Sequence, residues 1–172
     1  MASETIRTAL EQATTYLRAH PAEARYTDTA ASATLVDGLA IRVRGPAGEE
    51  ITTDMSPSVG GSGTGPSPGW LLRAAAASCV ATLTAMRAAM VSVELDELEV
   101  IVDSESDDRG ILGIDESVPA GPLSGRIEVR IRALGDVQSG QLEKIARWGV
   151  EHCPVRDALE RAVPIKVEVI TG

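Results

Sequence analysis

The sequence predicts an α+β protein, in which strands and helices occur in separate groups. Residues 31–54 show strand patterns separated by turn residues, and residues 95–106 and 125–134 show two further strand patterns. Helical patterns cover the remaining long segments, which are residues 3–19, 70–91, 136–152 and 154–161. Because the strands come in groups joined by antiparallel turns, we expect antiparallel sheets.

The chain begins with a predicted amphipathic helix over residues 3–19. Apolar residues recur at helical spacing from Ile6 to Leu17, and a His-Pro step follows and stops the helix. We expect residues 1–25 to be an N-terminal helical extension and residues 26–172 to form one domain.

An antiparallel three-stranded sheet is predicted next, over residues 31–54. The Asp37-Gly38 pair, between the segments ASATLV and LAIRVR, is a strong signal for a two-residue hairpin. A GPAG turn then leads into EEITTD. The segment from residue 55 to residue 69 is rich in Ser, Gly and Pro, and we interpret it as a mobile loop over a site rather than a domain boundary.

Two later segments alternate between apolar and polar residues, as half-buried strands do. In residues 125–134, Ile127, Val129 and Ile131 share one face, and charged residues occupy the other. The end of the chain, VPIKVEVI, alternates in the same way and is predicted to be a strand. Its apolar face consists of Val163, Ile165, Val167 and Val169.

Residues 70–91 are predicted to form the central helix. This segment is apolar nearly all round, so we expect it to be buried over most of its surface. Its many alanines allow another helix or a sheet to approach closely.

Composition limits the classes of function. The net charge of −9 makes nucleic acid and anionic membrane surfaces poor partners. The uninterrupted apolar runs are shorter than the ~20 residues of a membrane span. The first residues lack the apolar core of a signal peptide, so we expect a cytoplasmic protein.

The chain has two cysteines, Cys79 and Cys153. Cys79 lies about 16 Å from the start of its helix at Pro68, too far for the helix dipole to lower its pKa. A small buried thiol in a packed helix is the simpler interpretation, and a reactive thiol there needs a positive side chain.

Cys153 precedes Pro154, which suits the first position of a helix, so Cys153 is predicted at the N-cap. That position favours a thiolate, although a merely capping cysteine is equally consistent. With only His152 nearby, the cysteines have no recognised zinc spacing, and we predict no metal and no cofactor. If both thiols meet in space, peroxide reduction is their natural chemistry, through a sulfenic acid resolved as a disulfide.

The segments GPSPGWLLRAAAASC and CPVRDAL resemble the OsmC/Ohr family, the osmotically inducible and organic-hydroperoxide-resistance proteins. The resemblance implies an intertwined homodimer, with antiparallel sheets wrapped around the long cysteine-bearing helices. It also implies that Cys79 reduces an organic hydroperoxide and that Cys153 resolves it. The implied reductant is a dithiol, typically of the lipoyl type.

The sequence departs from the family pattern at two positions. Gly69 stands where the peroxidase branch has a glutamate, and Val36 occupies the position of the family arginine. Arg42, Arg44 and Arg109 are the candidate replacements for that arginine, and Arg42 is our first choice. Two other functions stay open: binding of a small hydrophobic ligand at the dimer interface, and redox sensing without turnover.

Overall fold

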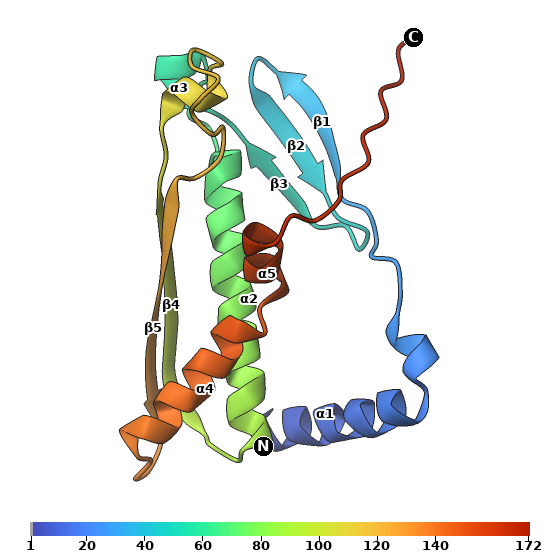
Figure 1. Ribbon diagram of the computed structural model, residues 1–172, viewed down its shortest axis with the longest axis vertical. Helices are drawn as coiled ribbons and strands as arrows, with labels where there is room; N and C mark the ends of the chain where they lie inside the picture. The colour runs from blue at the N-terminus through green and yellow to red at the C-terminus, as the bar shows by residue number, and fades with distance from the viewer. Residues whose placement is uncertain (1) are drawn as a thin grey trace. The chain divides into compact units, whose positions relative to one another are not determined.

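Figure 1 shows the computed structural model of the chain, which describes residues 2–172. The chain folds as two compact units: residues 8–75 form one, and residues 1–7 with 76–172 form the other. Helices α1 (Ala2–Ala19) and α2 (Pro68–Met90) contribute residues to both. Antiparallel sheets and a long helix confirm the predicted α+β class.

The unit of residues 8–75 contains an antiparallel sheet in the order β1-β2-β3. Strand β1 covers Ser32–Asp37, β2 covers Ala40–Arg44 and β3 covers Glu50–Thr53, as the turn signals predicted. At the hairpin between β1 and β2, Gly38 has φ +52°, which glycine adopts without steric cost. A 3-10 turn, η1 (Pro21–Ala24), follows α1.

The loop between β3 and α2 is organised by the carboxylate of Asp54, which is 2% exposed. Its Oδ1 accepts a hydrogen bond from the Met55 N–H at 2.7 Å. Its Oδ2 accepts hydrogen bonds from the N–H groups of Ser62 and Thr64 at 3.1 Å and from the Thr64 hydroxyl at 2.9 Å. The segment predicted to be a mobile loop therefore has a defined path, which includes the 3-10 turn η2 (Pro57–Val59).

The second unit is built on an antiparallel pair of long strands, β4 (Leu95–Glu105) and β5 (Ser124–Ala133). The predicted alternation of β5 is confirmed, because its apolar residues are partly buried and its arginines are exposed. The arginines pair with acidic residues of β4: Arg126 with Asp103, Arg130 with Glu99, and Arg132 with Asp96 and Glu97. These ion pairs cover the outer face of the ribbon.

Three helices complete this unit. The excursion between β4 and β5 contains the short helix α3 (Asp108–Ile111). After β5 come α4 (Ser139–Glu151) and α5 (Pro154–Glu160), close to their predicted ranges. The core cluster consists of Ala88 of α2, Val93 between α2 and β4, and Ile145 of α4. Residues of β4 and β5 pack against it. Figure 1 shows α4 lying across the second half of α2.

The single chain buries one stripe of α2 rather than most of its surface. Ala76, Val80, Thr84 and Ala88 recur every fourth residue and are buried, together with Ala89. The prediction of a helix buried on most sides is therefore wrong for the single chain. The hydrophobicity of a helix face indicates that its burial would be favourable, whereas its actual burial depends on which elements cover that face.

The predicted C-terminal strand is also wrong for the single chain. Residues 162–172 join no sheet, and Ile165, Val167 and Val169 are 83%, 77% and 82% exposed. A strand is stabilised by hydrogen bonds to a neighbouring strand. The alternating pattern of residues 163–169 favours a strand, but within the single chain no neighbouring strand pairs with this segment.

By length and composition alone, helix α2 is long and apolar enough to cross a membrane. Within the single chain, 17% of its most apolar window is buried. Its mean hydropathy over that window is 1.3. Charged and hydroxyl side chains such as Arg73, Thr82 and Arg87 interrupt the apolar runs of α2, so the length of uninterrupted apolar runs does not reveal this property. A core helix of a soluble protein meets the same criteria.

Candidate functional site

The structure brings Cys79 and Cys153 together within the unit of residues 76–172. Cys79 lies on α2 and is half-buried, whereas Cys153 lies at the start of α5 and is 1% exposed. Both are free thiols, and Cys153 lies close enough to Cys79 to raise the pKa of the Cys79 thiol. Two neighbouring thiols can exchange between the dithiol and disulfide states.

The local sequence explains where Cys153 sits. Cys153 is the N-cap residue of α5 and Pro154 is the first residue of the helix, as predicted. The Cys153 sulfur accepts a hydrogen bond from the N–H of Arg156 at 3.4 Å. The sulfur thereby satisfies one of the backbone donors that a helix start leaves free.

The surroundings of Cys79 favour the protonated, neutral form of its thiol. Burial raises the pKa of the Cys79 thiol above its ordinary value, and the neighbouring Cys153 thiol raises the pKa further. The backbone N–H of Val155, at the start of α5, donates to the Cys79 sulfur and opposes this rise in pKa. The thiolate, which is the nucleophilic form, is therefore a minor species at neutral pH.

Within residues 76–172, no arginine or lysine is among the groups that shift the pKa of Cys79. Arg109, one of the candidate activators, instead binds Asp107, with its Nε 3.0 Å from Oδ1. This guanidinium lowers the pKa of the Asp107 carboxyl to about 2. Arg109 is thus engaged by a neighbouring carboxylate.

The other candidate arginines lie on β2, in the unit of residues 8–75. Both contact Glu50 of β3: Arg44 Nε lies 2.8 Å from one carboxylate oxygen, and Arg42 Nε lies 3.4 Å from the other. The buried Arg42 Nε makes no well-aligned hydrogen bond to a described residue. That Arg42 activates Cys79 stays a prediction.

A close crossing of α2 and α4 lies near the thiols, and the sequence analysis did not single it out. Gly149 of α4 packs directly on Thr84 of α2, and both residues are buried. The available signal was the glycine itself, because a glycine inside a helical pattern is unfavourable unless close packing requires it.

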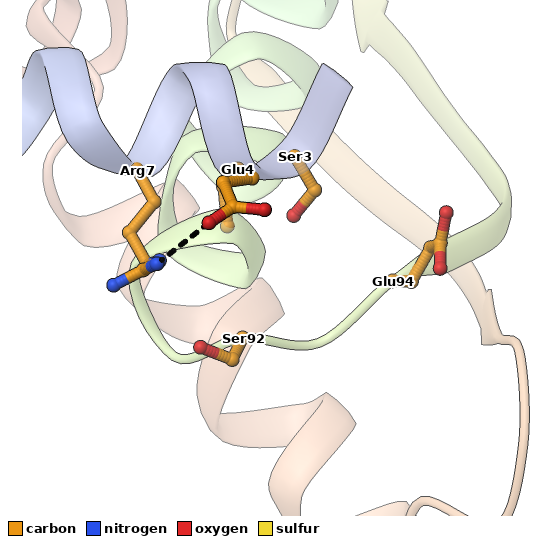
Figure 2. Close-up of a pocket in the computed structure, with 6 residues that line it drawn as sticks. Ser3, Glu4, Arg7, Ser92 and Glu94 are labelled. Atoms are coloured by element: carbon orange, nitrogen blue, oxygen red, sulfur yellow. Dashed lines mark hydrogen bonds and ion pairs between the residues drawn. The ribbon is translucent and has the colours of Figure 1, made fainter. Parts of the chain in front are cut away.

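Two adjoining clefts lie at the C-terminal end of α2. One has a volume of ≈ 240 Å³ and mixes polar and apolar residues, and the other measures ≈ 190 Å³ and is mainly apolar. Figure 2 shows the first, where Arg7 pairs with Glu4 beside Ser92. The residues that line the two clefts are Ser3, Glu4, Ile6, Arg7, Ala85, Ala88, Ala89, Ser92, Val93, Glu94 and Leu95.

Metal binding has no support among residues 2–172. In that range, no group of three or more His, Cys, Asp or Glu side chains is arranged to hold a metal ion. His152, which adjoins Cys153, instead stacks on Trp148 with ring centroids 4.1 Å apart.

Fold and site together define a class: an α+β protein that places two free thiols near each other, one on a long helix and one at the start of a short helix. The model of the family described as "OsmC-like protein" matches residues 61–168, more than half of the chain and both cysteines. The chain belongs to this family, as the two cysteine motifs predicted. A search of curated protein sequences finds no match to the chain.

Solved structures share the fold at low sequence identity. An OsmC-like protein from Mycoplasma pneumoniae has a TM-score of 0.66 at 14% identity, covering 79% of this chain and 89% of that one. A structure described as an organic hydroperoxide resistance protein OsmC, from Legionella pneumophila, has a TM-score of 0.57 at 18% identity, with coverages of 78% and 90%. An organic hydroperoxide resistance protein from Elizabethkingia anophelis has a TM-score of 0.57 at 16% identity, with coverages of 78% and 89%.

Proposed function

We propose that the protein is a thiol-dependent peroxidase that reduces organic hydroperoxides through Cys79 and Cys153. The observation that carries the proposal is the proximity of two free thiols, Cys79 on α2 and Cys153 at the start of α5. Membership of the OsmC family and the names of two structural neighbours, which are organic hydroperoxide resistance proteins, support the same substrate class.

The proposed reaction begins at Cys79, the more accessible of the two thiols. Its thiolate attacks one oxygen of the hydroperoxide, the O–O bond breaks, and an alcohol leaves after gaining a proton. Cys79 becomes a sulfenic acid. The thiolate of Cys153 then attacks the Cys79 sulfur, water leaves, and a disulfide forms. A dithiol reductant, which we propose is of the lipoyl type, restores both thiols by exchange.

A cation is required to make the first step fast, because burial and Cys153 keep Cys79 protonated. We propose Arg42 for this role, in place of the family arginine. Its Nε is buried without an aligned hydrogen bond, and its pairing with Glu50 is long at 3.4 Å. Gly69 occupies the position of the family glutamate and supplies no carboxylate there.

We propose that the protein works as a homodimer in the cytoplasm. The single chain leaves apolar groups uncovered on α2, where Trp70 is 48% exposed, and along the C-terminal segment. A second copy would bury these groups and give the alternating segment a strand to pair with. The net charge of −9 argues against nucleic acid and anionic membranes as partners.

The test is consumption of tert-butyl hydroperoxide by the purified protein with dihydrolipoamide as the reductant. We expect turnover in the wild type, loss of turnover in Cys79→Ser, and accumulation of the Cys79 sulfenic acid in Cys153→Ser. Arg42→Met should lower the rate of sulfenic acid formation, and Arg44→Met serves as its matched control. A wild-type rate equal to that of buffer would refute the proposal.

A second function is favoured by the apolar cleft of ≈ 190 Å³ at the end of α2. A small hydrophobic ligand could bind there without either thiol, since Cys79 lies six residues, about 9 Å of helix rise, before Ala85. Thermal shifts with short-chain fatty acids or alcohols that persist in the Cys79→Ser/Cys153→Ser variant would favour this function over the peroxidase.

A further inference from the structure

The closest approach of α4 to α2 is made possible by a missing side chain. A Cβ atom at Gly149 would lie 2.8 Å from the backbone nitrogen of Thr84 and 3.0 Å from its Cα, and closer still to its hydroxyl oxygen. Real Cβ atoms do not make contacts this short, and the backbone of Thr84 cannot rotate away. Any larger residue at position 149 must therefore push α4 away from α2.

This crossing is close in sequence to both cysteines, on α2 and on α4. Thr84 follows Cys79 by five residues on the same helix, a rise of about 7.5 Å. Gly149 precedes Cys153 by four residues, and the Cys153 N–H still bonds the Val150 carbonyl at 3.4 Å. The position of α4 on α2 therefore sets where Cys153 meets Cys79.

A second contact holds the same end of α4. The guanidinium of Arg87, on α2, lies 5.4 Å from the centre of the Trp148 ring, a cation–π contact. Trp148 in turn stacks on His152, whose Nδ1 lies 2.9 Å from the Trp148 carbonyl oxygen. The residue before Cys153 is thus linked through Trp148 to α2.

We propose that Gly149 is a positioning residue for the dithiol pair, and that the contact of Gly149 with Thr84, supported by Arg87 and Trp148, keeps the two sulfurs close enough to bond. Disulfide geometry is narrow, with Cβ atoms only about 3.5–4.5 Å apart, so a displacement near 1 Å matters. For activity, this inference rests on the proposed peroxidase function. The position of the thiols can be measured without peroxide.

The experiment is the equilibrium between the Cys79–Cys153 disulfide and reduced or oxidised dithiothreitol, followed by mass spectrometry after acid quenching. We expect Gly149→Ala to lower the equilibrium constant for disulfide formation by roughly tenfold or more, about 30 mV in potential. The matched control is Gly140→Ala on the same helix, where a Cβ meets no atom within 4 Å. It should leave the equilibrium constant unchanged.

A suppressor tests the contact itself. Thr84→Ala removes the hydroxyl nearest to the added Cβ, so the double variant Thr84→Ala/Gly149→Ala should recover part of the lost equilibrium constant. If Gly149→Ala fails to fold, as judged by circular dichroism, Trp148→Leu takes its place, because it removes the Arg87 contact without adding volume. We expect the equilibrium constant to fall in Trp148→Leu as well.

The inference is overturned if folded Gly149→Ala, or Trp148→Leu in its place, keeps the disulfide equilibrium of the wild type. That result is distinct from failure of the proposed function. A protein that forms the disulfide normally but consumes no hydroperoxide would disprove the peroxidase and leave the positioning role of Gly149 measurable.

Discussion

Cys79 combines a nucleophilic atom with neighbours that keep it protonated. Burial and the Cys153 thiol raise its pKa, and the Val155 N–H only partly opposes them. The neutral thiol is therefore the form that the folded state favours. Its contribution to stability is fully present below the unfolded-state pKa, and is lost as the pH rises through the higher folded-state pKa.

We predict that, in the Arg42→Met variant, which lacks the proposed activating cation, the reactivity of Cys79 increases steeply with pH. Its rate of alkylation by iodoacetamide should rise about tenfold per pH unit and not level off near the ordinary thiol pKa of ~8.5. The same chain unfolded in urea should level off there. Cys153→Ala removes a group that raises the pKa of Cys79, so its profile should shift to lower pH. A plateau already reached near neutral pH in Arg42→Met would contradict the raised pKa, whereas a plateau at lower pH in the wild type than in Arg42→Met would support Arg42 as the activator.

The packing of Ile145 supports a second prediction about a single side chain. Ile145 is 2% exposed and lies in the core cluster with Ala88 and Val93. Ile145→Ala should lower the free energy of unfolding by about 2–5 kcal/mol, because it removes buried methyl groups and leaves a cavity. Ile114→Ala, at a position 69% exposed, is the control and should change it little. Urea unfolding of the reduced protein measures both.

Among the secondary-structure elements, the loop before α2 shows how one carboxylate can order a segment rich in glycine and serine. Hydrogen bonds from Thr64, Met55 and Ser62 lower the pKa of Asp54, the Thr64 N–H being the largest cause. A group with a lowered folded-state pKa stabilises the fold above its unfolded pKa, and this stabilisation is lost as the pH falls through the folded-state pKa.

We predict that Asp54→Asn loosens this loop. Both carboxylate oxygens accept hydrogen bonds, whereas an asparagine turns an NH₂ group toward donors on one side. Protection of the Ser62 and Thr64 amides against hydrogen exchange should fall roughly tenfold. Asp28→Asn, at an exposed aspartate of the same unit, should leave this protection unchanged. Unaltered exchange in Asp54→Asn would mean that other contacts order the loop.

Across both units of the chain, the described residues 2–172 leave many apolar side chains exposed. The C-terminal segment is the clearest case, since it alternates like a strand but joins no sheet. Helix α2 is buried along one stripe only. Both features are consistent with the proposed homodimer, in which a second copy would supply the missing neighbours.

We predict that the apolar face of this segment stabilises the proposed homodimer. Ile165→Asp with Val167→Asp should raise the dissociation constant of the dimer at least roughly tenfold, because each buried apolar side chain contributes about 1.5–3 kcal/mol. Lys166→Gln with Glu168→Gln, on the alternate positions, is the matched control. Sedimentation velocity over a concentration series gives the dissociation constant. Equal values for both variants and the wild type would exclude a role of this face in assembly.

Most elements of secondary structure follow from local patterns. The Asp37-Gly38 turn predicted the β1–β2 hairpin, and the alternation from Arg126 to Arg132 predicted β5 and its exposed face. The start of α5 at Pro154 was predictable because proline suits the first helical position. These signals act over a few residues, so they can be recognised without the rest of the chain.

The proximity of the two thiols was predictable only through the family resemblance. Their motifs are far apart in the chain, and no local rule places one beside the other. Arg109 could not be judged as an activator from its position either, because its pairing with Asp107 depends on how the excursion folds. The role of Gly149 likewise became visible only when Thr84 was found against it.

Turn chemistry, residue periodicity and helix capping are short-range properties, and they sufficed to predict the α+β class and most of the elements, whereas the family was predicted from the resemblance of the two cysteine motifs. Long-range packing decides the rest: which face of α2 is covered, where the C-terminal segment lies, and how near Cys153 comes to Cys79. The physical reason is that the burial of a side chain and the proximity of two thiols each require two segments that are distant in sequence. Only the tertiary structure brings such segments together.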